Sequence, residues 1–193
     1  MNIEYEATFA NIEKDDIRTR LAKVGAALER VEFLQKRYTF DVPDTCRLSN
    51  AWVRVRDEGN RATLTLKDMP SEGGTIDDQK ELEVIVSDYD EAVAIMRNMG
   101  LVEKAYQESR REIWLLDDVE IMIDEWPWLE PFVEIEGVGE QVVKNVSQKL
   151  GFEWEDAIFG AVCVQYKRKY GVSHEVINFQ TKRFVFGEPN PFE

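Results

Sequence analysis

The sequence has few of the residues on which several classes of protein depend. Its 193 residues include two cysteines, Cys46 and Cys163, and one histidine, His174. Two distant cysteines make neither a disulfide framework nor a cysteine-based zinc site. A nucleophilic dyad or triad would need the histidine, which lies in an irregular C-terminal stretch, so we do not expect this chemistry. Cys163 lies in the apolar run AVCVQY, where a small buried hydrophobe is the usual role.

Long hydrophobic runs and an excess of basic residues are absent too. No apolar segment is long enough to cross a bilayer, and no basic region followed by an apolar stretch begins the chain, so we expect neither a membrane protein nor a signal peptide. Net charge is −14, from 38 acidic and 24 basic residues, which argues against general binding of nucleic acid. We expect a cytoplasmic protein. Homodimers are common at this size, and the sequence leaves the oligomeric state open.

Alternation of hydrophobic and polar residues predicts many strands, joined mostly by short connections. Helical spacing predicts helices over about 13–29, 139–150 and 154–171. It predicts a further helix that Ser87 or Asp88 caps and Gly100 ends. Residues 68–78 are rich in Gly, Ser and Asp and predict a loop. Strands in runs interrupted by single helices indicate an α+β protein with a mainly antiparallel sheet, which could close into a barrel. The expected strands are 2–9, 34–41, 51–57, 61–68, 79–87, 110–116, 119–126 and 131–137.

Charges of one sign recur at alternate positions of these strands. Side chains alternate along a strand, so each pair lies on one face roughly 7 Å apart, where like charges repel. For a single pair, a solvated outer face is the simplest explanation. Three strands with only acids and one with only arginines instead indicate a face that something external neutralises. The pairs are Glu4 and Glu6, Glu81 and Glu83, Glu134 and Glu136, and Arg54 and Arg56.

Carboxylate pairs and basic side chains on one concave surface fit a metal-bound polyphosphate. Carboxylate oxygens are hard ligands suited to Mg²⁺ or Mn²⁺. Arginine can engage two phosphate oxygens at once, and Lys67, at the end of the strand TLTLK, adds a further cation. A closed barrel with its polar face inward would gather these groups around one cavity.

These residues, in this order, resemble the motifs of the CYTH superfamily, the triphosphate tunnel metalloenzymes. That family includes class IV adenylyl cyclases, thiamine triphosphatases and inorganic triphosphatases. The resemblance covers about residues 3–166. The stretch IDEWPWLEPFVEIEG is its most telling part. The matching positions are Glu4 and Glu6, Arg54 and Arg56, Lys67, Glu81 and Glu83, Arg111, Asp124, and Glu134 and Glu136.

The resemblance implies a mainly antiparallel, eight-stranded closed β-barrel with flanking helices, formed by residues 1–170, with residues 171–193 as a C-terminal extension or lid. It implies that a triphosphate is bound by Arg54, Arg56, Lys67 and Arg111, which with Glu4 and Glu6 form the catalytic set. It implies that one or two Mg²⁺ or Mn²⁺ ions are held by Glu4, Glu6, Glu81, Glu83, Asp124, Glu134 and Glu136.

Two positions depart from the family pattern. The family lysine after the first E-x-E is Thr8 here, and a second basic position, two residues before Arg111, is Ser109. Arg37 lies on a neighbouring strand where relatives often carry an acid. We hypothesise that Arg37 replaces part of the missing positive charge and binds the triphosphate.

Three functions are compatible with this constellation. The first is metal-dependent hydrolysis of inorganic triphosphate, thiamine triphosphate or a nucleoside triphosphate. The second is a class IV adenylyl cyclase that makes cyclic AMP and pyrophosphate from ATP. The third is a non-catalytic module that binds polyphosphate or nucleotide, which Thr8 favours. Trp126, Trp128 and Phe132 could stack on an organic group, although packing in a core or at a rim is the commoner role of such residues.

Overall fold

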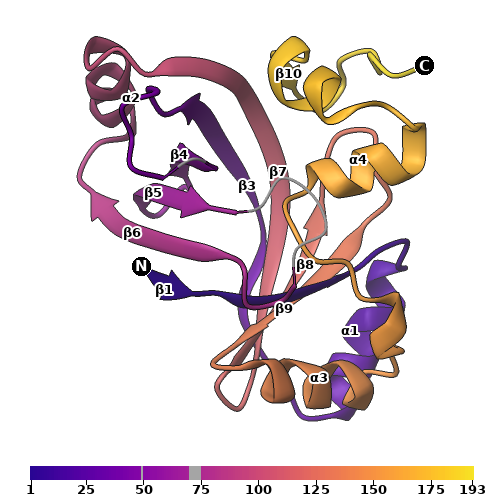
Figure 1. The fold of residues 1–193 in the computed structure, drawn as a ribbon. Coiled ribbons are helices and arrows are strands. Elements are labelled where there is room, and N and C mark those ends of the chain that lie inside the picture. Colours follow the sequence, from indigo (N-terminus) through magenta and orange to yellow (C-terminus); the bar gives the residue numbers. More distant parts are fainter. Residues whose placement is uncertain (49, 70–74) are drawn as a thin grey trace.

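A computed structural model describes residues 1–48, 50–69 and 75–193. Its sheet is mainly antiparallel and its helices lie on the outside of the sheet (Figure 1). The strands are β1 (Asn2–Ile3), β2 (Tyr5–Phe9), β3 (Ala27–Asp41), β4 (Ala51–Asp57), β5 (Ala62–Asp68), β6 (Lys80–Val86), β7 (Val102–Leu116), β8 (Val119–Glu125), β9 (Phe132–Gly137) and β10 (Arg183–Phe184). The helices are α1 (Lys14–Lys23), α2 (Tyr89–Asn98), α3 (Glu140–Lys149), the 3₁₀ turn η1 (Trp154–Asp156), α4 (Cys163–Tyr170) and the π-helical turn η2 (Val176–Gln180).

The sheet is nearly closed into a barrel, and the N-terminal segment joins its two edges. The strand order is β1-β6-β5-β4-β3-β7-β8-β9-β2, with β10 parallel to β7. Since β1 and β2 are consecutive and flank Glu4, the two ends of this path meet in one segment. The α+β barrel is therefore confirmed. The predicted strand count of eight is wrong, because the path has nine strands: the N-terminal strand is divided at Glu4.

The closure is short on the β6 side. β1 pairs with β6 only at Asn2↔Glu81 and Ile3↔Lys80, whereas β2 pairs with β9 over five residues. In the described part of the chain, the remainder of β6, residues 82–86, pairs only with β5. The strand pairing that closes the barrel is therefore shortest beside the acidic pair of β6, Glu81 and Glu83.

Two hydrophobic clusters cover the outside of the sheet, and a third lies under the C-terminal elements, where part of it lines the cavity. Helices α1 and α3 pack on the outer faces of β2, β8 and β9. Helix α2 packs on β4 and β5. The C-terminal elements α4, η2 and β10 lie over β7, together with Trp126 and Phe132. Apolar residues therefore face outward into these clusters, and the alternate positions of each strand are left to face the interior.

Local chemistry explains where the predicted elements begin and end. The strands predicted over 51–57 and 61–68 and the helix α2 are confirmed: Asp88 caps α2 by accepting a hydrogen bond from the backbone N–H of Glu91. Gly100, at φ +85°, lies just beyond its C-terminus. The prediction for 68–78 falls partly on residues 70–74, which lie outside the described residues.

Two helix predictions are wrong in extent. The helix predicted over 13–29 ends at Lys23, because Gly25 adopts φ +81° and residues 27–29 join β3. The helix predicted over 154–171 is interrupted: η1 is followed by extended backbone in which Ile158 exchanges hydrogen bonds with Thr8. Only the second half, α4, is helical. Among the described residues, no helix combines the length and apolarity needed to span a bilayer.

Candidate active site

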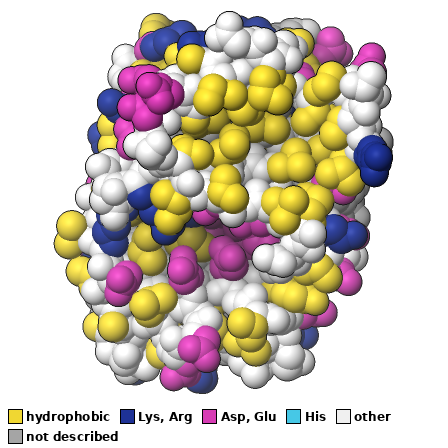
Figure 2. All heavy atoms as spheres, turned by 90° about the vertical axis from the view of Figure 1, so that its left-hand side faces the viewer, with side chains coloured by type: hydrophobic (Ala, Val, Ile, Leu, Met, Phe, Trp, Pro, Cys, Tyr) yellow, Lys and Arg dark blue, Asp and Glu magenta, His cyan; other side chains and the backbone are white. Residues whose placement is uncertain are grey.

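The barrel encloses a cavity of about 500 Å³. Every predicted site residue except Asp124 lines it, because alternate residues of each strand face inward. Figure 2 shows a hollow with acidic side chains at its floor and hydrophobic side chains along one rim. The predicted residues that line the cavity are Glu4, Glu6, Arg37, Arg54, Arg56, Lys67, Glu81, Glu83, Arg111, Glu134 and Glu136.

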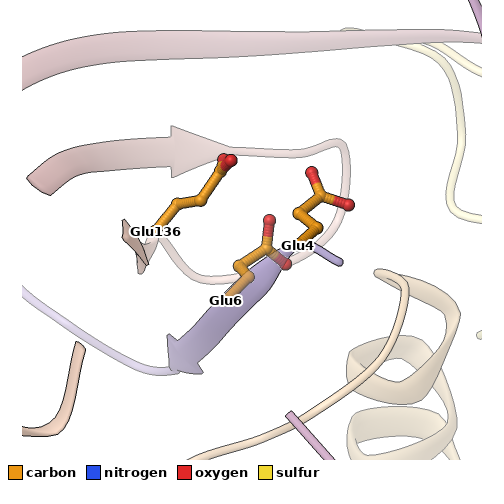
Figure 3. Close-up of side chains that lie close together, drawn as sticks. All are labelled: Glu4, Glu6 and Glu136. Carbon is orange, nitrogen blue, oxygen red and sulfur yellow. The ribbon is translucent and has the colours of Figure 1, made fainter. Parts of the chain in front are cut away.

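At one end of the cavity, three carboxylates converge. Glu4 and Glu6 come from the N-terminal segment, and Glu136 comes from β9, where it is the register partner of Glu6. One carboxylate oxygen from each lies within 4.8 Å of the others (Figure 3). Burial, and then repulsion from Glu4, raises the pKa of Glu6 to about 8 and that of Glu136 to about 7. We refer to Glu4, Glu6 and Glu136 as the acidic cluster.

The donor set of the acidic cluster fits a hard divalent cation. Three carboxylate oxygens within bridging distance are what Mg²⁺ and Mn²⁺ prefer. Burial raises the pKa values of Glu6 and Glu136 although Lys67 lies near both, so these two carboxylates favour a further positive charge. Lys67 supplies part of it: its ammonium donates to Glu4 at 2.7 Å and lies 3.3 Å from Glu81. Burial opposes the charge of Lys67, but the neighbouring glutamates, Glu4 first, raise its pKa overall.

On the other side of the cavity lie Arg37, Arg54 and Arg56, which we call the arginine wall. All three are buried, with 5%, 8% and 7% of their surface exposed. Their Nε–H groups have no hydrogen-bond partner among the described residues. Burial, and then repulsion from Arg54, lowers the pKa of Arg56 to about 10, and burial with repulsion from Arg56 lowers that of Arg37.

The arginine wall is only partly neutralised by acids. Arg56 forms an ion pair with Glu58 at 2.6 Å and lies 3.7 Å from Glu83. Arg54 lies 3.4 Å from the same carboxylate of Glu83. Arg37 has no carboxylate within ion-pair distance in the described part of the chain. Buried guanidinium groups with unused donors favour an anion at this wall.

Arg37 occupies the place that the sequence departures leave open. Its guanidinium donates to Gln35 at 2.7 Å and to the hydroxyl of Ser109, and it stacks over Trp126 at 4.5 Å. Gln35 and Ser109 are register partners on β3 and β7. Ser109 and Arg37, the residues at two positions where the sequence was expected to depart from the family pattern, are therefore in direct contact. This contact supports the hypothesis of a relocated charge.

Arg111 lies between two carboxylates rather than free in the cavity. Its guanidinium donates from Nε to Asp124 at 2.8 Å, and one terminal nitrogen, Nη2, donates to both Asp124 and Glu134. Burial alone would lower its pKa, but Asp124 and then Glu134 raise it. Burial and repulsion from Glu6 raise the pKa of Glu134. Asp124 is 1% exposed and both its oxygens accept from Arg111, which favours a positioning role over the predicted metal-binding role.

Sequence reasoning missed four acids that line the cavity: Asp41, Glu58, Asp78 and Glu120. Glu58 lies between the predicted strands 51–57 and 61–68, yet it is 3% exposed, accepts from Arg61 at 2.6 Å and forms an ion pair with Arg56 at 2.6 Å. Glu120 is opposite Glu136 in the register of β8 and β9. The spacing of Glu120, Met122 and Asp124 at alternate positions was a signal that could have found it.

Of the other residues considered from the sequence, some line the cavity and others pack in a hydrophobic cluster. Thr8 is 2% exposed and is the register partner of Glu134. Trp126, Cys163 and His174 line the cavity. Phe132 is fully buried in the C-terminal cluster, and Trp128 packs against the same cluster, so the packing role considered for both is what the structure shows.

Comparisons with known proteins agree with this geometry. The CYTH domain matches residues 2–155. The chain is 26% identical over 151 residues to a Methanocaldococcus jannaschii protein named "putative adenylate cyclase". The match covers 76% of this chain and 81% of that protein.

Three solved structures have the same fold. A Pyrococcus horikoshii protein has a TM-score of 0.68 and 22% identity, over 81% of this chain and 94% of that one. A "putative adenylate cyclase" from Vibrio parahaemolyticus has a TM-score of 0.71 and 13% identity, over 86% and 98%. A Hippeastrum "putative adenylyl cyclase", described as having a dominant triphosphatase activity, has a TM-score of 0.53 and 14% identity, over 99% of both chains.

Proposed function

The chain belongs to the CYTH family, and on that premise we propose that it catalyses metal-dependent hydrolysis of a triphosphate inside the barrel. The observation that carries this proposal is the division of one cavity into an acidic cluster and an arginine wall. The acidic cluster lacks positive charge and the arginine wall lacks negative charge, and the two sides do not neutralise each other. A polyphosphate with a divalent cation supplies both.

The proposed roles follow from the contacts. Arg37, Arg54 and Arg56 bind phosphate oxygens through donors that the protein leaves unused. Arg111, fixed by Asp124, and Lys67 extend this positive surface toward the acidic cluster. These groups hold the phosphate chain in place and stabilise the charge that develops on its oxygens, which is most of what phosphoryl transfer requires.

The acidic cluster, with Glu81, Glu120 and Glu134 near it, would hold Mg²⁺ or Mn²⁺. When bound, the metal would polarise phosphate oxygens and assist formation of the nucleophile. The carboxylates must be deprotonated for this, so binding is coupled to loss of the proton that burial favours on Glu6. Glu58 and Glu83 accept from the arginine wall and so orient its side chains.

Adenylyl cyclase activity is the second candidate. The relatives named as adenylate cyclases favour it. In that reaction the ribose 3′-oxygen attacks the α-phosphorus, a bond forms between them, and pyrophosphate leaves. The same array of cations would serve, so the two reactions differ in which phosphorus is attacked and by which oxygen.

A product assay distinguishes the candidates. We expect the purified chain with Mg²⁺ or Mn²⁺ to release phosphate from inorganic triphosphate, thiamine triphosphate or ATP, and to lose this activity in excess chelator. Pyrophosphate together with cyclic AMP would replace the first proposal with the second. Tight binding without any product would identify a binding module, and a large gain of turnover in Thr8→Lys would show that the native site has degenerated. No binding and no product would reject all three.

A further inference from the structure

We propose that the outside of the sheet carries a second ligand site, an aromatic cage for a methylated ammonium cation. The site is a cavity of about 370 Å³, which we call the outer cavity. Three tyrosines and two acids form most of its lining, together with Lys36 and Arg183. The tyrosines and acids are Tyr38, Tyr89, Tyr106, Asp90 and Glu108. The proposed triphosphate chemistry uses none of these residues.

The outer cavity lies on the opposite face of β3 and β7 from the barrel cavity, because neighbouring residues of a strand point to opposite faces. Arg37 and Gln107 line the barrel cavity. Their chain neighbours Tyr38 and Tyr106, which are register partners, line the outer cavity. The remaining walls come from α2 and β10, which flank the upper part of β7 (Figure 1). A ligand in the outer cavity therefore leaves the barrel cavity open to a triphosphate.

Three phenol rings surround the outer cavity. The ring centroids of Tyr38 and Tyr106 are 5.1 Å apart, with ring planes inclined by 56°. The ring centroids of Tyr38 and Tyr89 are 6.4 Å apart, with ring planes inclined by 21°. The face of an aromatic ring attracts a cation electrostatically, and groups of such rings suit quaternary ammonium ions.

The protein already places cations on two of these rings. Arg97 lies 4.7 Å from the ring centroid of Tyr38, and Arg183 lies 5.4 Å from that of Tyr106. Each arginine also forms an ion pair with a carboxylate that does not line the outer cavity, at 2.6 Å and 2.8 Å respectively. No cation lies over the ring of Tyr89 in the described part of the chain, so this ring remains for a ligand.

The acids of the outer cavity lack basic partners. Within the described ranges, no lysine or arginine lies at ion-pair distance from Asp90 or Glu108. The carboxylate of Glu108 instead accepts from the hydroxyl of Tyr106 at 3.2 Å and from the backbone N–H of Phe186 at 3.4 Å. Lys36, the register partner of Glu108, is exposed, so water and salt screen its charge. Two carboxylates against one exposed ammonium leave an excess of negative charge, which favours a cation.

The hydroxyl of Tyr89 supports the same assignment. It is buried and has no hydrogen-bond partner among the described residues. Burial raises the pKa of Tyr89, and so do its two ring neighbours and the carboxylates of Asp57 and Asp90. The charges around this hydroxyl are therefore acidic. A ligand with a cationic head and a polar substituent would supply both the missing positive charge and the missing hydrogen-bond partner.

A methylated ammonium fits the outer cavity better than a metal ion does. A hard metal ion needs several carboxylate oxygens that converge. The one group of three acids that meets this requirement in the described structure is the acidic cluster of the barrel. A methylated ammonium needs no such ligands, because ring faces stabilise its charge. A cavity of about 370 Å³ has room for this group with a short substituent.

The test titrates the full chain with choline and with its uncharged isostere 3,3-dimethylbutan-1-ol. Calorimetry gives Kd, and proton NMR follows the methyl signal of each ligand. We expect roughly millimolar binding of choline, as suits so small a ligand, and binding of the isostere that is weaker by roughly tenfold or more. The methyl signal of choline should move upfield, because protons over a ring face are shielded. A parallel titration with trimethyllysine distinguishes a free small molecule from a modified protein side chain as the source of the cation.

Two variants probe the cage. Tyr106→Leu removes a ring and Glu108→Gln removes a charge, and each should weaken choline binding by roughly fivefold. The control is Glu29→Gln, at an exposed position of β3 that lines neither cavity, which should keep the wild-type Kd. Thermal unfolding checks that each variant is folded.

The outcomes are separable from those of the proposed function, since no triphosphate is needed to observe choline binding. The absence of saturable binding, or equal affinity for choline and its isostere, overturns the cage. So does a wild-type Kd in both folded variants, or displacement of choline by inorganic triphosphate, which would place choline in the barrel cavity. Weaker binding in Tyr106→Leu and Glu108→Gln, with simultaneous binding of choline and triphosphate in the wild type, supports the cage.

Discussion

The acidic cluster and the arginine wall face each other across one cavity, yet they tolerate their like charges differently. Glu6 and Glu136 can take up protons, and their pKa values of about 8 and about 7 show that burial and repulsion favour this. Arginine keeps its charge at any ordinary pH. The arginine wall instead forms ion pairs with Glu58 and Glu83. Its three Nε–H groups have no hydrogen-bond partner among the described residues. A change of pH can therefore change the charge of the acidic cluster, whereas the arginine wall needs a bound anion for its neutralisation.

The largest expected effect comes from removing a charge from the acidic cluster. Glu6→Gln should reduce metal-dependent turnover by roughly 10³-fold, because a metal ligand that stabilises transition-state charge is worth several kcal/mol. In chelator at pH 8 the same variant should be more stable than the wild type, since it lacks a buried charge that has no metal partner. Steady-state kinetics and thermal unfolding measure the two effects.

The matched control is Glu155→Gln, at an exposed position. Wild-type turnover in Glu6→Gln would remove the acidic cluster from the mechanism. A loss of stability in chelator would show that the carboxylate of Glu6 is satisfied without a metal.

A smaller effect is expected on the basic side. Arg37→Met keeps a long side chain against Trp126 but removes the charge, and should weaken binding of the preferred triphosphate by roughly thirtyfold, since a hydrogen bond to a charged group contributes about 2 kcal/mol. The unliganded protein should unfold at a higher temperature, because a buried cation without a carboxylate partner is lost. Calorimetry and thermal unfolding test both.

Arg168→Met, at an exposed position of α4, serves as the control. If Arg37→Met and wild type bind with the same Kd, Arg37 does not compensate for Thr8 and Ser109.

The pH dependence of stability sharpens the comparison further. Because the pKa of Glu6 rises from 4.5 to about 8 on folding, the folded state holds this proton more tightly. The free energy of unfolding in chelator should therefore fall as pH rises from about 4.5 to 8. Urea unfolding at pH 5.5, 7 and 8.5 measures the slope. Saturating Mg²⁺ should flatten it, and Glu6→Gln should reduce it without metal. A slope of the opposite sign in the wild type would contradict the raised pKa.

The smallest effect is expected outside the cavity. Asp16 and Arg20 form an exposed i,i+4 pair at 2.6 Å on α1, with side chains 53% and 39% exposed. Water already screens these charges, so Asp16→Asn should change the free energy of unfolding by no more than about 0.5 kcal/mol and leave triphosphate Kd unchanged. A loss comparable with that in a cavity variant would mean that surface charges also matter to the site.

Strand periodicity was enough to predict which charges face inward. A period of two assigns a face without knowledge of strand pairing, so Arg54 and Arg56, and the three glutamate pairs, were found from the sequence. The fold class followed from the same alternation together with the family resemblance.

Cross-strand contacts were not predictable, because they depend on register. The contact of Arg37 with Ser109 requires the pairing of Gln35 with Ser109 on β3 and β7. The bidentate hold of Asp124 on Arg111 likewise follows from their pairing on β7 and β8. The helix predicted over 154–171 failed for a similar reason: hydrogen bonds of Ile158 with Thr8, far away in sequence, outweigh local helical preference.

The division of the N-terminal strand at Glu4 has a consequence for the order of folding. β1 pairs with β6, and β2 pairs with β9 near the end of the matched domain, so both pairings of this segment join residues far apart in the chain. Contacts so distant along the chain slow folding, because long loops must close before they contribute. We therefore expect Glu4 and Glu6 to stay hydrated until late in folding, and their carboxylates to come together when these pairings close the barrel.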